Sequence, residues 1–245
     1  MAITAHQALV TGGTKGIGRA VVRRLAREGH AVVAVYHSDD ATREDAAREF
    51  SEARLQVGFE RADLSNPEEV AGLFERLTEM GHSPELLVNA GEFTGDASIA
   101  FLGETDVDAV LDANLRATFL TCQQAVKVMA HRRFGRIINF TSPEAMLAGE
   151  GQLAHAVSKA GVLGLTRALA REVGHLGITV NAVSPGVVRT EMTPLSVTRL
   201  EAFVRLTPLQ RAGTADEIAG MVNMLCEDGA GYITGQCLAI DGGLS

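Results

Sequence analysis

The sequence predicts an α/β protein in which a doubly wound parallel sheet of about seven strands carries helices on both faces. Short runs rich in Val, Ile and Leu alternate with helical patterns from one end of the chain to the other, which is typical of βαβ units. The runs are almost continuously apolar, as expected for strands buried on both faces. No linker, repeat or low-complexity segment interrupts the 245 residues. We therefore expect a single domain spanning residues 1–245.

The apolar runs are the expected strands, and they cover residues 6–11, 31–36, 56–63, 86–89, 136–141, 178–183 and 236–240. The expected helices cover residues 16–29, 42–53, 67–80, roughly 106–131, a long stretch that holds His155 and Lys159 in its first turns, and 215–226. Gly29 closes the first helix and Pro67 opens the third, and both are residues that favour those positions. Residues 190–213 are predicted to be irregular or short helical.

Composition and charge exclude several classes of function. The formal net charge of −8 argues against a nucleic-acid or anionic-membrane partner. No apolar run reaches transmembrane length, and the N-terminus lacks the basic flank and cleavage site of a signal peptide. Cys122, Cys226 and Cys237 are far apart in apolar contexts, so we interpret them as buried thiols without a metal site. These observations predict a cytoplasmic protein.

A glycine-rich loop, T-G-G-T-K-G-I-G from Thr11 to Gly18, lies between the first strand and the first helix. Glycines allow close backbone approach to a phosphate, and the helix N-terminus supplies N–H groups and partial positive charge. The alternative is a helix entry without a ligand. Its position at the start of an alternating α/β chain instead favours dinucleotide binding and a Rossmann-type fold. The predicted contacts are Gly12, Thr14, Lys15, Gly16, Ile17 and Gly18.

The end of the second strand predicts which dinucleotide binds. An acidic residue there would hold the ribose 2′-hydroxyl of NAD and repel a 2′-phosphate. Here His37 and Ser38 follow the strand, and the first carboxylate is Asp39. Lys15 can reach the same region as a point charge, so we predict NADP(H) over NAD(H). In the alternative, Lys15 is only solvated and Asp39 turns inward. Asp63 and Leu64, after the third strand, are the expected adenine contacts.

A candidate proton-transfer group follows the fifth strand. Ser142 lies at the strand end, and His155 and Lys159 are four residues apart in the next helix, so they share a helix face. A hydroxyl, a titratable ring and an ammonium directed at one point are suited to general acid–base chemistry. The alternative is a capped amphipathic helix with an exposed lysine.

Together these motifs resemble the short-chain dehydrogenases/reductases, and within them the β-ketoacyl-[acyl-carrier-protein] reductase group. The resemblance covers essentially the whole chain. It rests on the following segments: T-G-G-T-K-G-I-G, V-N-A-G (Val88 to Gly91), Asn114-Leu115, Ser142, S-K-A-G (Ser158 to Gly161), N-A-V-S-P-G-V-V-R-T-E-M (Asn181 to Met192) and Y-I-T-G-Q-C-L-A-I-D-G-G (Tyr232 to Gly243).

The resemblance implies roles for individual residues. Asn114 would hold a proton-relay water, Ser142 would orient the substrate carbonyl, and Lys159 would bind the nicotinamide ribose. Residues 190–213 would form a lid over the substrate. Further cofactor contacts would be Asn89, Ala90, Gly91, Pro185, Gly186, Val188 and Thr190. Read from the residues alone, Asn114 could instead cap or kink its helix, Ser142 could be a turn residue, and Ser184 to Gly186 could be only a turn.

The chain departs from the family at the residue that usually donates the proton. The family places a Tyr thirteen residues after the Ser and four before the Lys, and here that position is His155. Of the two tyrosines, Tyr36 lies on the second predicted strand and Tyr232 near the C-terminal turn, so neither can replace it. A neutral imidazole is a weak acid, so His155 would have to act as imidazolium, which nearby Lys159 disfavours. A bridging water could carry the proton across the shorter side chain.

The predicted function is an NADPH-dependent ketoreductase that reduces a 3-oxoacyl thioester or related polyketide or fatty-acyl carbonyl to the hydroxyl. The alternatives are a cofactor-binding but catalytically impaired subunit, paired with an active paralogue, and an isomerase or lyase that uses His155 as a base. The substrate would be a small molecule or bound to a carrier protein. Arg132, Arg133 and Arg136 are candidates for a carrier-binding patch; the alternative is a solvated turn. The family resemblance implies a homotetramer.

Overall fold

The computed structural model describes residues 5–95, 97–143, 145, 150–191 and 197–245. Its central feature is a seven-stranded sheet with the strand order β3-β2-β1-β4-β5-β6-β9, in which every pair of neighbours is parallel. The strands are β1 Gln7–Thr11, β2 Ala31–Tyr36, β3 Val57–Arg61, β4 Leu86–Asn89, β5 Gly135–Phe140, β6 Ile178–Pro185 and β9 Cys237–Ile240. This confirms the predicted fold class, and each strand overlaps its predicted run.

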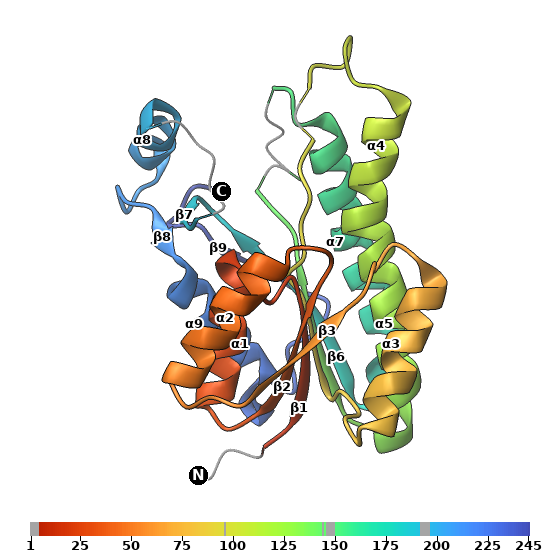
Figure 1. The fold of residues 1–245 in the computed structure, drawn as a ribbon. Coiled ribbons are helices and arrows are strands. Elements are labelled where there is room, and N and C mark those ends of the chain that lie inside the picture. Colours follow the sequence, from red (N-terminus) through yellow and green to blue (C-terminus); the bar gives the residue numbers. More distant parts are fainter. Residues whose placement is uncertain (1–4, 96, 144, 146–149, 192–196) are drawn as a thin grey trace.

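Helices cover both faces of the sheet (Figure 1). Helices α1 (Gly16–Arg27), α2 (Asp40–Glu52) and α9 (Ala215–Cys226) lie on one face. The other face carries α3 Pro67–Glu79, α5 Ala117–Arg132 and α7 Leu153–Val173, with α4 Glu104–Leu111 extending beyond it. Short helical turns occupy residues 174–176 and 228–230.

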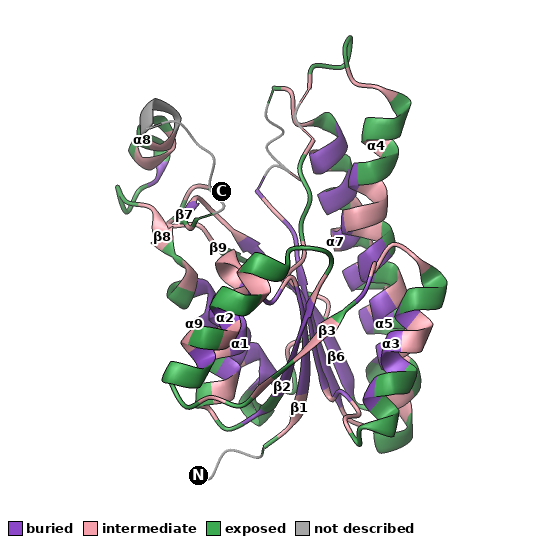
Figure 2. Ribbon diagram, viewed as in Figure 1, coloured by how far each residue is buried: buried purple, intermediate pink, exposed green. Residues whose placement is uncertain are grey.

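The alternation of side chains along the strands produces two cores, one under each helix layer. Val10 and Val88 point into the cluster that contains residues of α1 and α9, whereas their neighbours Leu9 and Leu87 point into the cluster with residues of α3, α5 and α7. Figure 2 shows the central strands of the sheet as buried, whereas the edge strands β3 and β9 are partly exposed. Strands buried on both faces must be apolar at every position, which explains the continuous Val, Ile and Leu runs.

The helix predicted over roughly 106–131 is longer and less regular than expected. Helix α4 is followed by a π-helical segment, η1, over Asp112–Arg116, and α5 continues from there. A π-helical turn inserts one residue into the hydrogen-bond ladder and is common at functional sites. Here it coincides with Asn114.

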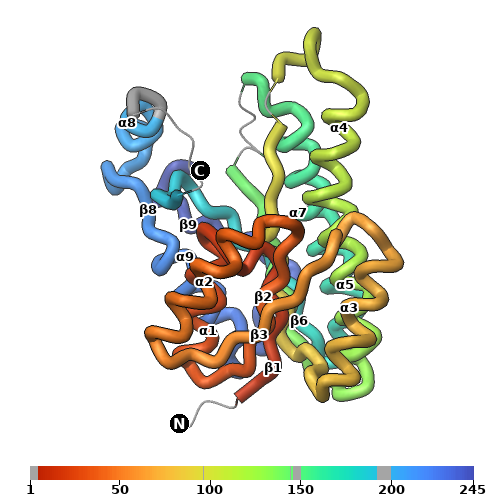
Figure 3. Tube along the Cα trace, viewed as in Figure 1, coloured from red at the N-terminus to blue at the C-terminus, as the bar shows by residue number. Residues whose placement is uncertain are grey.

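Among its described residues, the segment predicted to be a lid, 190–213, contains one helix. Strand β7 (Val188–Arg189) pairs with β8 (Gly213–Thr214), and α8 (Val197–Leu206) lies between them in the chain. Residues 192–196 lie outside the described residues. The tube in Figure 3 shows α8 at the same end of the molecule as the loops that precede α4 and α7. Those two loops are joined by a hydrogen bond from the Ala97 N–H to the Gly151 carbonyl, at 2.9 Å.

The arginines considered for carrier binding lie at the amino edge of the sheet, opposite the edge where parallel strands end. Arg132 pairs with Glu85 at 2.9 Å, Arg133 donates to the His175 carbonyl, and Arg136 is 5% exposed with its guanidinium 4.3 Å from the Phe134 ring centre. A helix-to-strand junction enters a parallel sheet at its amino edge, whereas ligands bind at the carboxyl edge. The three arginines therefore lie away from the carboxyl edge where the cleft was expected, and their role in carrier binding stays a prediction.

Two histidines, the buried His30 and the partly buried His82, predict how stability depends on pH. Burial lowers the pKa of both His30 and His82 from the usual 6.5, and His30 Nδ1 accepts the His6 N–H at 3.1 Å, which requires an unprotonated nitrogen. The unfolded chain therefore binds protons more readily, so stability falls as the pH drops below about 6.5. We expect the urea midpoint to decrease from pH 7 to pH 5, and to decrease less in a His30→Gln, His82→Gln variant. His131→Gln, at an exposed position, is the control, and equal slopes in all three proteins would contradict the assignment.

Candidate active site at the carboxyl edge of the sheet

The predicted site residues lie in or next to the segments that follow the strands, and these segments meet at one edge of the sheet. Thr11 of β1 is level with Asn89 of β4, and Asn89 is level with Asn139 of β5. Because all strands are parallel, the loops after β1, β4 and β5 emerge side by side. The sheet order therefore brings together sequence motifs that are more than a hundred residues apart.

The glycine-rich loop packs directly against the turn after β4. Gly12 has a φ of +62°, and a Cβ on it would lie 2.8 Å from the Gly91 Cα. The Gly91 N–H donates to the Thr11 hydroxyl at 3.1 Å. A Cβ on Gly18 would overlap the Gly12 carbonyl. These contacts leave no room for side chains, so the backbone itself forms the floor of the site.

The N-terminus of α1 already holds an anionic group. The Gly16 N–H donates to Glu191 Oε1 at 2.8 Å, and this hydrogen bond holds the pKa of the Glu191 carboxyl below its usual range. N–H groups without helical partners and the helix dipole favour an anion at this point. Sequence reasoning did not single out Glu191, because its contact joins segments 175 residues apart.

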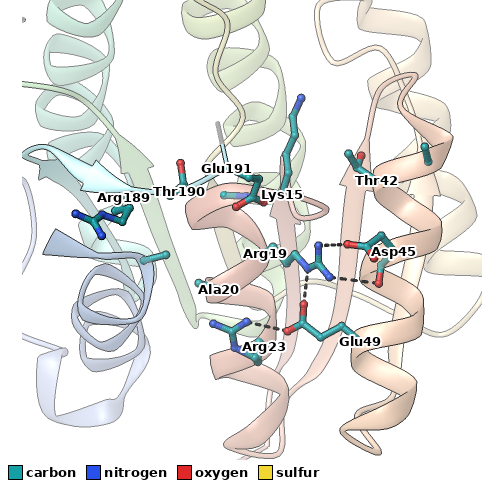
Figure 4. Close-up of a pocket in the computed structure, with 13 residues that line it drawn as sticks. Lys15, Arg19, Ala20, Arg23, Thr42, Asp45, Glu49, Arg189, Thr190 and Glu191 are labelled. Atoms are coloured by element: carbon teal, nitrogen blue, oxygen red, sulfur yellow. Dashed lines mark hydrogen bonds and ion pairs between the residues drawn. The ribbon is translucent and has the colours of Figure 1, made fainter. Parts of the chain in front are cut away.

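A cavity of about 580 Å³ lies beside the glycine loop, between α1, α2 and the segment after β7 (Figure 4). Its inner wall is a charge network in which Arg19 contacts Asp45 and Glu49, and Arg23 contacts Glu49 and Asp216. These arginines are compensated by carboxylates. Lys15, Thr42 and Thr190 also line the cavity, whereas Ser142, His155 and Lys159 do not.

The end of β2 bears on the choice of dinucleotide. Asp39 is the N-cap of α2 and accepts the Thr42 N–H at 3.0 Å, so in this structure the carboxylate stabilises a helix rather than turning inward. Arg61 Nε donates to the His37 carbonyl at 2.9 Å, which places a guanidinium beside His37 and Ser38. Arg61 was not expected from sequence; it comes from the neighbouring strand β3, and its proximity depends on the register of β2 and β3.

The other predicted dinucleotide contacts lie along the same edge. Asp63 follows β3, and hydrogen bonds from Ser65 lower the pKa of its carboxyl. Leu64 packs against the core under α3. Pro185 ends β6, and the next residue, Gly186, donates its N–H to the Ile240 carbonyl at 3.0 Å. Val188 is buried. A direct role of these residues in cofactor binding stays a prediction.

The Asn89 side chain makes its hydrogen bonds to buried residues beneath the site. Its amide donates to Asn139 Oδ1 at 2.9 Å, and its Oδ1 accepts the Thr121 hydroxyl at 2.8 Å. Asn139 in turn donates to the Thr166 hydroxyl at 3.0 Å. This buried polar network ties β4 and β5 to α5 and α7, so it fixes the level at which the next residues, Ala90 and Gly91, leave the sheet.

Lys159 is buried, which rules out the alternative of an exposed lysine on an amphipathic helix. Its side chain is 3% exposed, and Nζ donates to the Phe140 carbonyl at 3.2 Å. The Thr141 hydroxyl donates to the Lys159 carbonyl at 3.0 Å. Ser142, the next residue, therefore leaves β5 beside the same turn of α7 that carries Lys159.

A carboxylate that was not predicted lies between the two titratable groups of α7. Glu92 Oε1 is 3.4 Å from His155 Nε2 and 3.5 Å from Lys159 Nζ. Glu92 is the residue directly after the V-N-A-G motif. That position was a signal in the sequence, but only the tertiary packing of the turn against α7 reveals what the side chain reaches.

Asn114 connects the π-helical segment to the turn that carries Glu92. Its Oδ1 accepts the Phe93 N–H and its Nδ2 donates to the Phe93 carbonyl, both at 2.8 Å. Nδ2 also lies 3.1 Å from the Ser158 hydroxyl, which donates to the His155 carbonyl at 2.7 Å. Asn114 thus lies in a π-helical turn and ties that turn to α7 and to the segment after β4, and its role in holding a proton-relay water stays a prediction.

The described residues contain no cluster of His, Cys, Asp and Glu suited to a metal ion. Within the same residues, no helix is both long and apolar enough to cross a membrane. Burial raises the pKa of the Cys122 and Cys226 thiols to about 12, which fits their interpretation as inert buried groups.

Comparison with known proteins places the chain in a family. Residues 12–245 match a family model described as enoyl-(acyl carrier protein) reductase. A 3-oxoacyl-[acyl-carrier-protein] reductase of Synechocystis is 36% identical over 99% of this chain and 98% of the relative. An acetoacetyl-CoA reductase of Allochromatium vinosum is 37% identical, with 98% of each chain covered.

A solved structure supports the same conclusion. A protein of Agrobacterium tumefaciens, described as a candidate gluconate dehydrogenase, superposes with a TM-score of 0.95 at 29% identity, covering 99% of this chain and 96% of that one. The sequence matches over nearly the full length of the chain, and the sheet order and the glycine-rich loop agree with those matches, so the family can be assigned. The chain belongs to the short-chain dehydrogenase/reductase family.

Proposed function

We propose that the protein is an NADPH-dependent ketoreductase that reduces the 3-oxo group of an acyl thioester to a hydroxyl. The observation that carries this proposal is the buried Lys159 ammonium next to His155, at the sheet edge where the glycine-rich loop offers a dinucleotide site. The relatives named above are reductases of acetoacetyl-CoA and 3-oxoacyl carrier proteins, and they supply the substrate class. The thioester is either free or attached to a carrier protein.

The residues present fit a nicotinamide dinucleotide. The carboxylate of Glu191 on the Gly16 N–H shows that the N-terminus of α1 accepts an anion, and the pyrophosphate would take that place. Gly12 and Gly18 have no space for a Cβ, so backbone can approach the phosphates. Lys159 would bind the nicotinamide ribose. When bound, NADPH would supply the hydride that reduces the carbonyl carbon.

Charges at the rim support NADPH rather than NADH. Arg61 is held beside His37 by its bond to the His37 carbonyl, and Lys15 lines the cavity next to α2; both cations would stabilise a ribose 2′-phosphate. Asp39, the nearest candidate for a hydroxyl-binding carboxylate, is engaged as a helix cap. A doubly charged phosphate is stabilised by such a basic rim.

In the proposed reaction, different side chains orient the substrate carbonyl and protonate it. The Ser142 hydroxyl would donate a hydrogen bond to the carbonyl oxygen and orient it. His155, as imidazolium, would give a proton from Nε2 to that oxygen as it gains negative charge, which leaves neutral imidazole. Asn114 holds the turn before α4 through Phe93 and keeps the other groups in register. The lid segment around α8 would cover the substrate.

We also propose that the protein assembles as a homotetramer. Helices α5 and α7 present apolar side chains to solvent in this single chain: Phe119 is 48% exposed and Val157 is 52% exposed. Leu115, Phe119 and Leu165 line a shallow apolar depression on the same face. Contiguous exposed apolar surface is typical of protein interfaces.

The decisive experiment measures NADPH oxidation with an acetoacetyl thioester between about pH 5.5 and pH 8, with NADH as the comparison. We expect turnover that increases toward low pH, because the acid must be imidazolium. In the His155→Tyr variant the activity should extend to higher pH, since a phenol keeps its proton there. No turnover in the original protein but recovery in the Tyr variant would replace the proposal with an impaired partner subunit. No turnover in either would favour non-redox chemistry.

A further inference from the structure

Glu92 is a half-exposed carboxylate in contact with two buried basic groups. Its side chain is 46% exposed, whereas those of His155 and Lys159 are 5% and 3% exposed. A single oxygen, Oε1, makes both contacts, at 3.4 Å and 3.5 Å. The carboxylate therefore lies between the imidazole and the ammonium on one side and solvent on the other.

The backbone on both sides of Glu92 is fixed by hydrogen bonds that do not involve its side chain. The Gly91 N–H donates to the Thr11 hydroxyl at 3.1 Å. The Phe93 N–H and carbonyl are both bonded to the Asn114 amide at 2.8 Å. Position 92 is thus held at the sheet edge by its neighbours, and substitution there removes a charge without removing a support of the fold.

The charge of the Glu92 carboxylate affects how readily His155 takes up a proton. Two cations on one face of α7 repel each other, so Lys159 opposes protonation of His155. A carboxylate within about 4 Å of both favours the charged form of each. Among the described residues in these contacts, Glu92 is the acidic group that faces His155, and Lys159 is the basic group that shares it.

We propose that Glu92 is the charge partner that lets His155 hold a proton at neutral pH beside the Lys159 side chain. Glu92 is then a positioning residue, because it acts through His155 and not on the substrate. This inference rests on the proposed reductase function, in which His155 is the proton donor. It also favours that function over the isomerase or lyase alternative, which needs a neutral imidazole as base.

The contact distances suit a group that must release its proton. Ordinary N–H···O hydrogen bonds measure 2.7–3.2 Å, and both contacts of Glu92 are longer. The proton on His155 Nε2 is therefore stabilised by charge without being held in a short bond, and a substrate oxygen can take it. After the transfer, the half-exposed carboxylate attracts a solvent proton back to the imidazole.

The first test observes the titration of His155 directly by NMR of protein labelled at histidine, with the signal assigned by its loss in His155→Tyr. In Glu92→Gln the titration midpoint is expected to fall by about one pH unit, a tenfold loss of proton affinity. Glu92→Asp keeps the negative charge but places it further from His155, so the titration midpoint should shift less. Glu75→Gln removes the same charge from an exposed position on α3 and should leave the midpoint unchanged. An unchanged midpoint in Glu92→Gln would overturn the proposal.

The second test uses the pH profile of turnover. Glu92→Gln should lose about tenfold in kcat above the His155 midpoint and little below it. In the His155→Tyr background, the same substitution should cost nothing, because a neutral phenol needs no carboxylate. An equal loss in both backgrounds would mean a merely structural role and would also overturn the proposal.

The two tests separate this inference from the proposed function. If the original protein does not oxidise NADPH but the midpoint shifts in Glu92→Gln, the charge pairing stands and the reductase function fails. If turnover is present and the midpoint does not move, the reductase function stands and the role of Glu92 fails.

Discussion

Lys159→Met is expected to lower kcat/KM for NADPH and an acetoacetyl thioester by about 10³-fold, the range seen when a proton-transfer or charge-stabilising group is removed. The ammonium is buried, bonded to the Phe140 carbonyl and in contact with Glu92. Methionine fills similar space but offers no donor to the nicotinamide ribose. The substitution also removes the positive charge that opposes protonation of His155. The imidazolium should then persist to higher pH, and the residual activity should extend to higher pH with it.

Lys127→Met is the matched control, because Lys127 is exposed on α5 and its Nζ lies 3.3 Å from Gln124 Oε1. Steady-state kinetics of both variants test whether Lys159 takes part in the reaction, and thermal melting checks that both variants are folded. If Lys159→Met retains more than a tenth of the original kcat/KM while remaining folded, Lys159 has no part in the chemistry.

Gly18→Ala is expected to weaken NADPH binding by about 10²-fold. The added Cβ would overlap the Gly12 carbonyl, so the loop must open, and overpacking of this kind costs about 1–3 kcal/mol. The displaced loop also withdraws the backbone that would carry the pyrophosphate. Fluorescence titration of NADPH measures the affinity without requiring turnover.

Gly220→Ala is the matched control for Gly18→Ala, because it also adds one methyl group to a glycine but is not expected to weaken NADPH binding. Gly220 lies in α9, and a Cβ there meets no atom within 4 Å. Alanine in a helix interior should raise the free energy of unfolding by about 0.5–1 kcal/mol and leave NADPH affinity unchanged. Equal NADPH affinity in Gly18→Ala and Gly220→Ala would show that the glycine-rich loop is not the dinucleotide site.

Local pattern was enough to predict the sheet and its helices. Leu9 and Val10 face opposite cores, so every residue of such a strand must be apolar, and a continuous apolar run marks it. The glycine-rich loop was recognisable because Gly12 and Gly18 are required by close backbone contacts. Ser142, His155 and Lys159 could be grouped because they are close in sequence and share an element boundary.

The remaining features depend on contacts that local pattern does not encode. The π-helical segment at Asn114 interrupts a helix whose composition stays helical throughout, and it coincides with a pair of hydrogen bonds to Phe93 in another segment. Glu92 and Arg61 acquire their neighbours only through packing and strand register. Arg132, Arg133 and Arg136 lie at the amino edge of the sheet, because a segment that leads from a helix into a strand reaches that edge.

The way in which Glu92 is held has a consequence for how such a site can evolve. Because main-chain groups of Gly91 and Phe93 make the supporting bonds, the side chain at position 92 can change with little cost to folding. A lineage with tyrosine at position 155 can therefore acquire glutamate at position 92 as a nearly neutral step. In the proposed mechanism, a carboxylate already present at position 92 offsets the cost of exchanging tyrosine for histidine at position 155. The two substitutions can thus arise one after the other, without passing through an inactive intermediate.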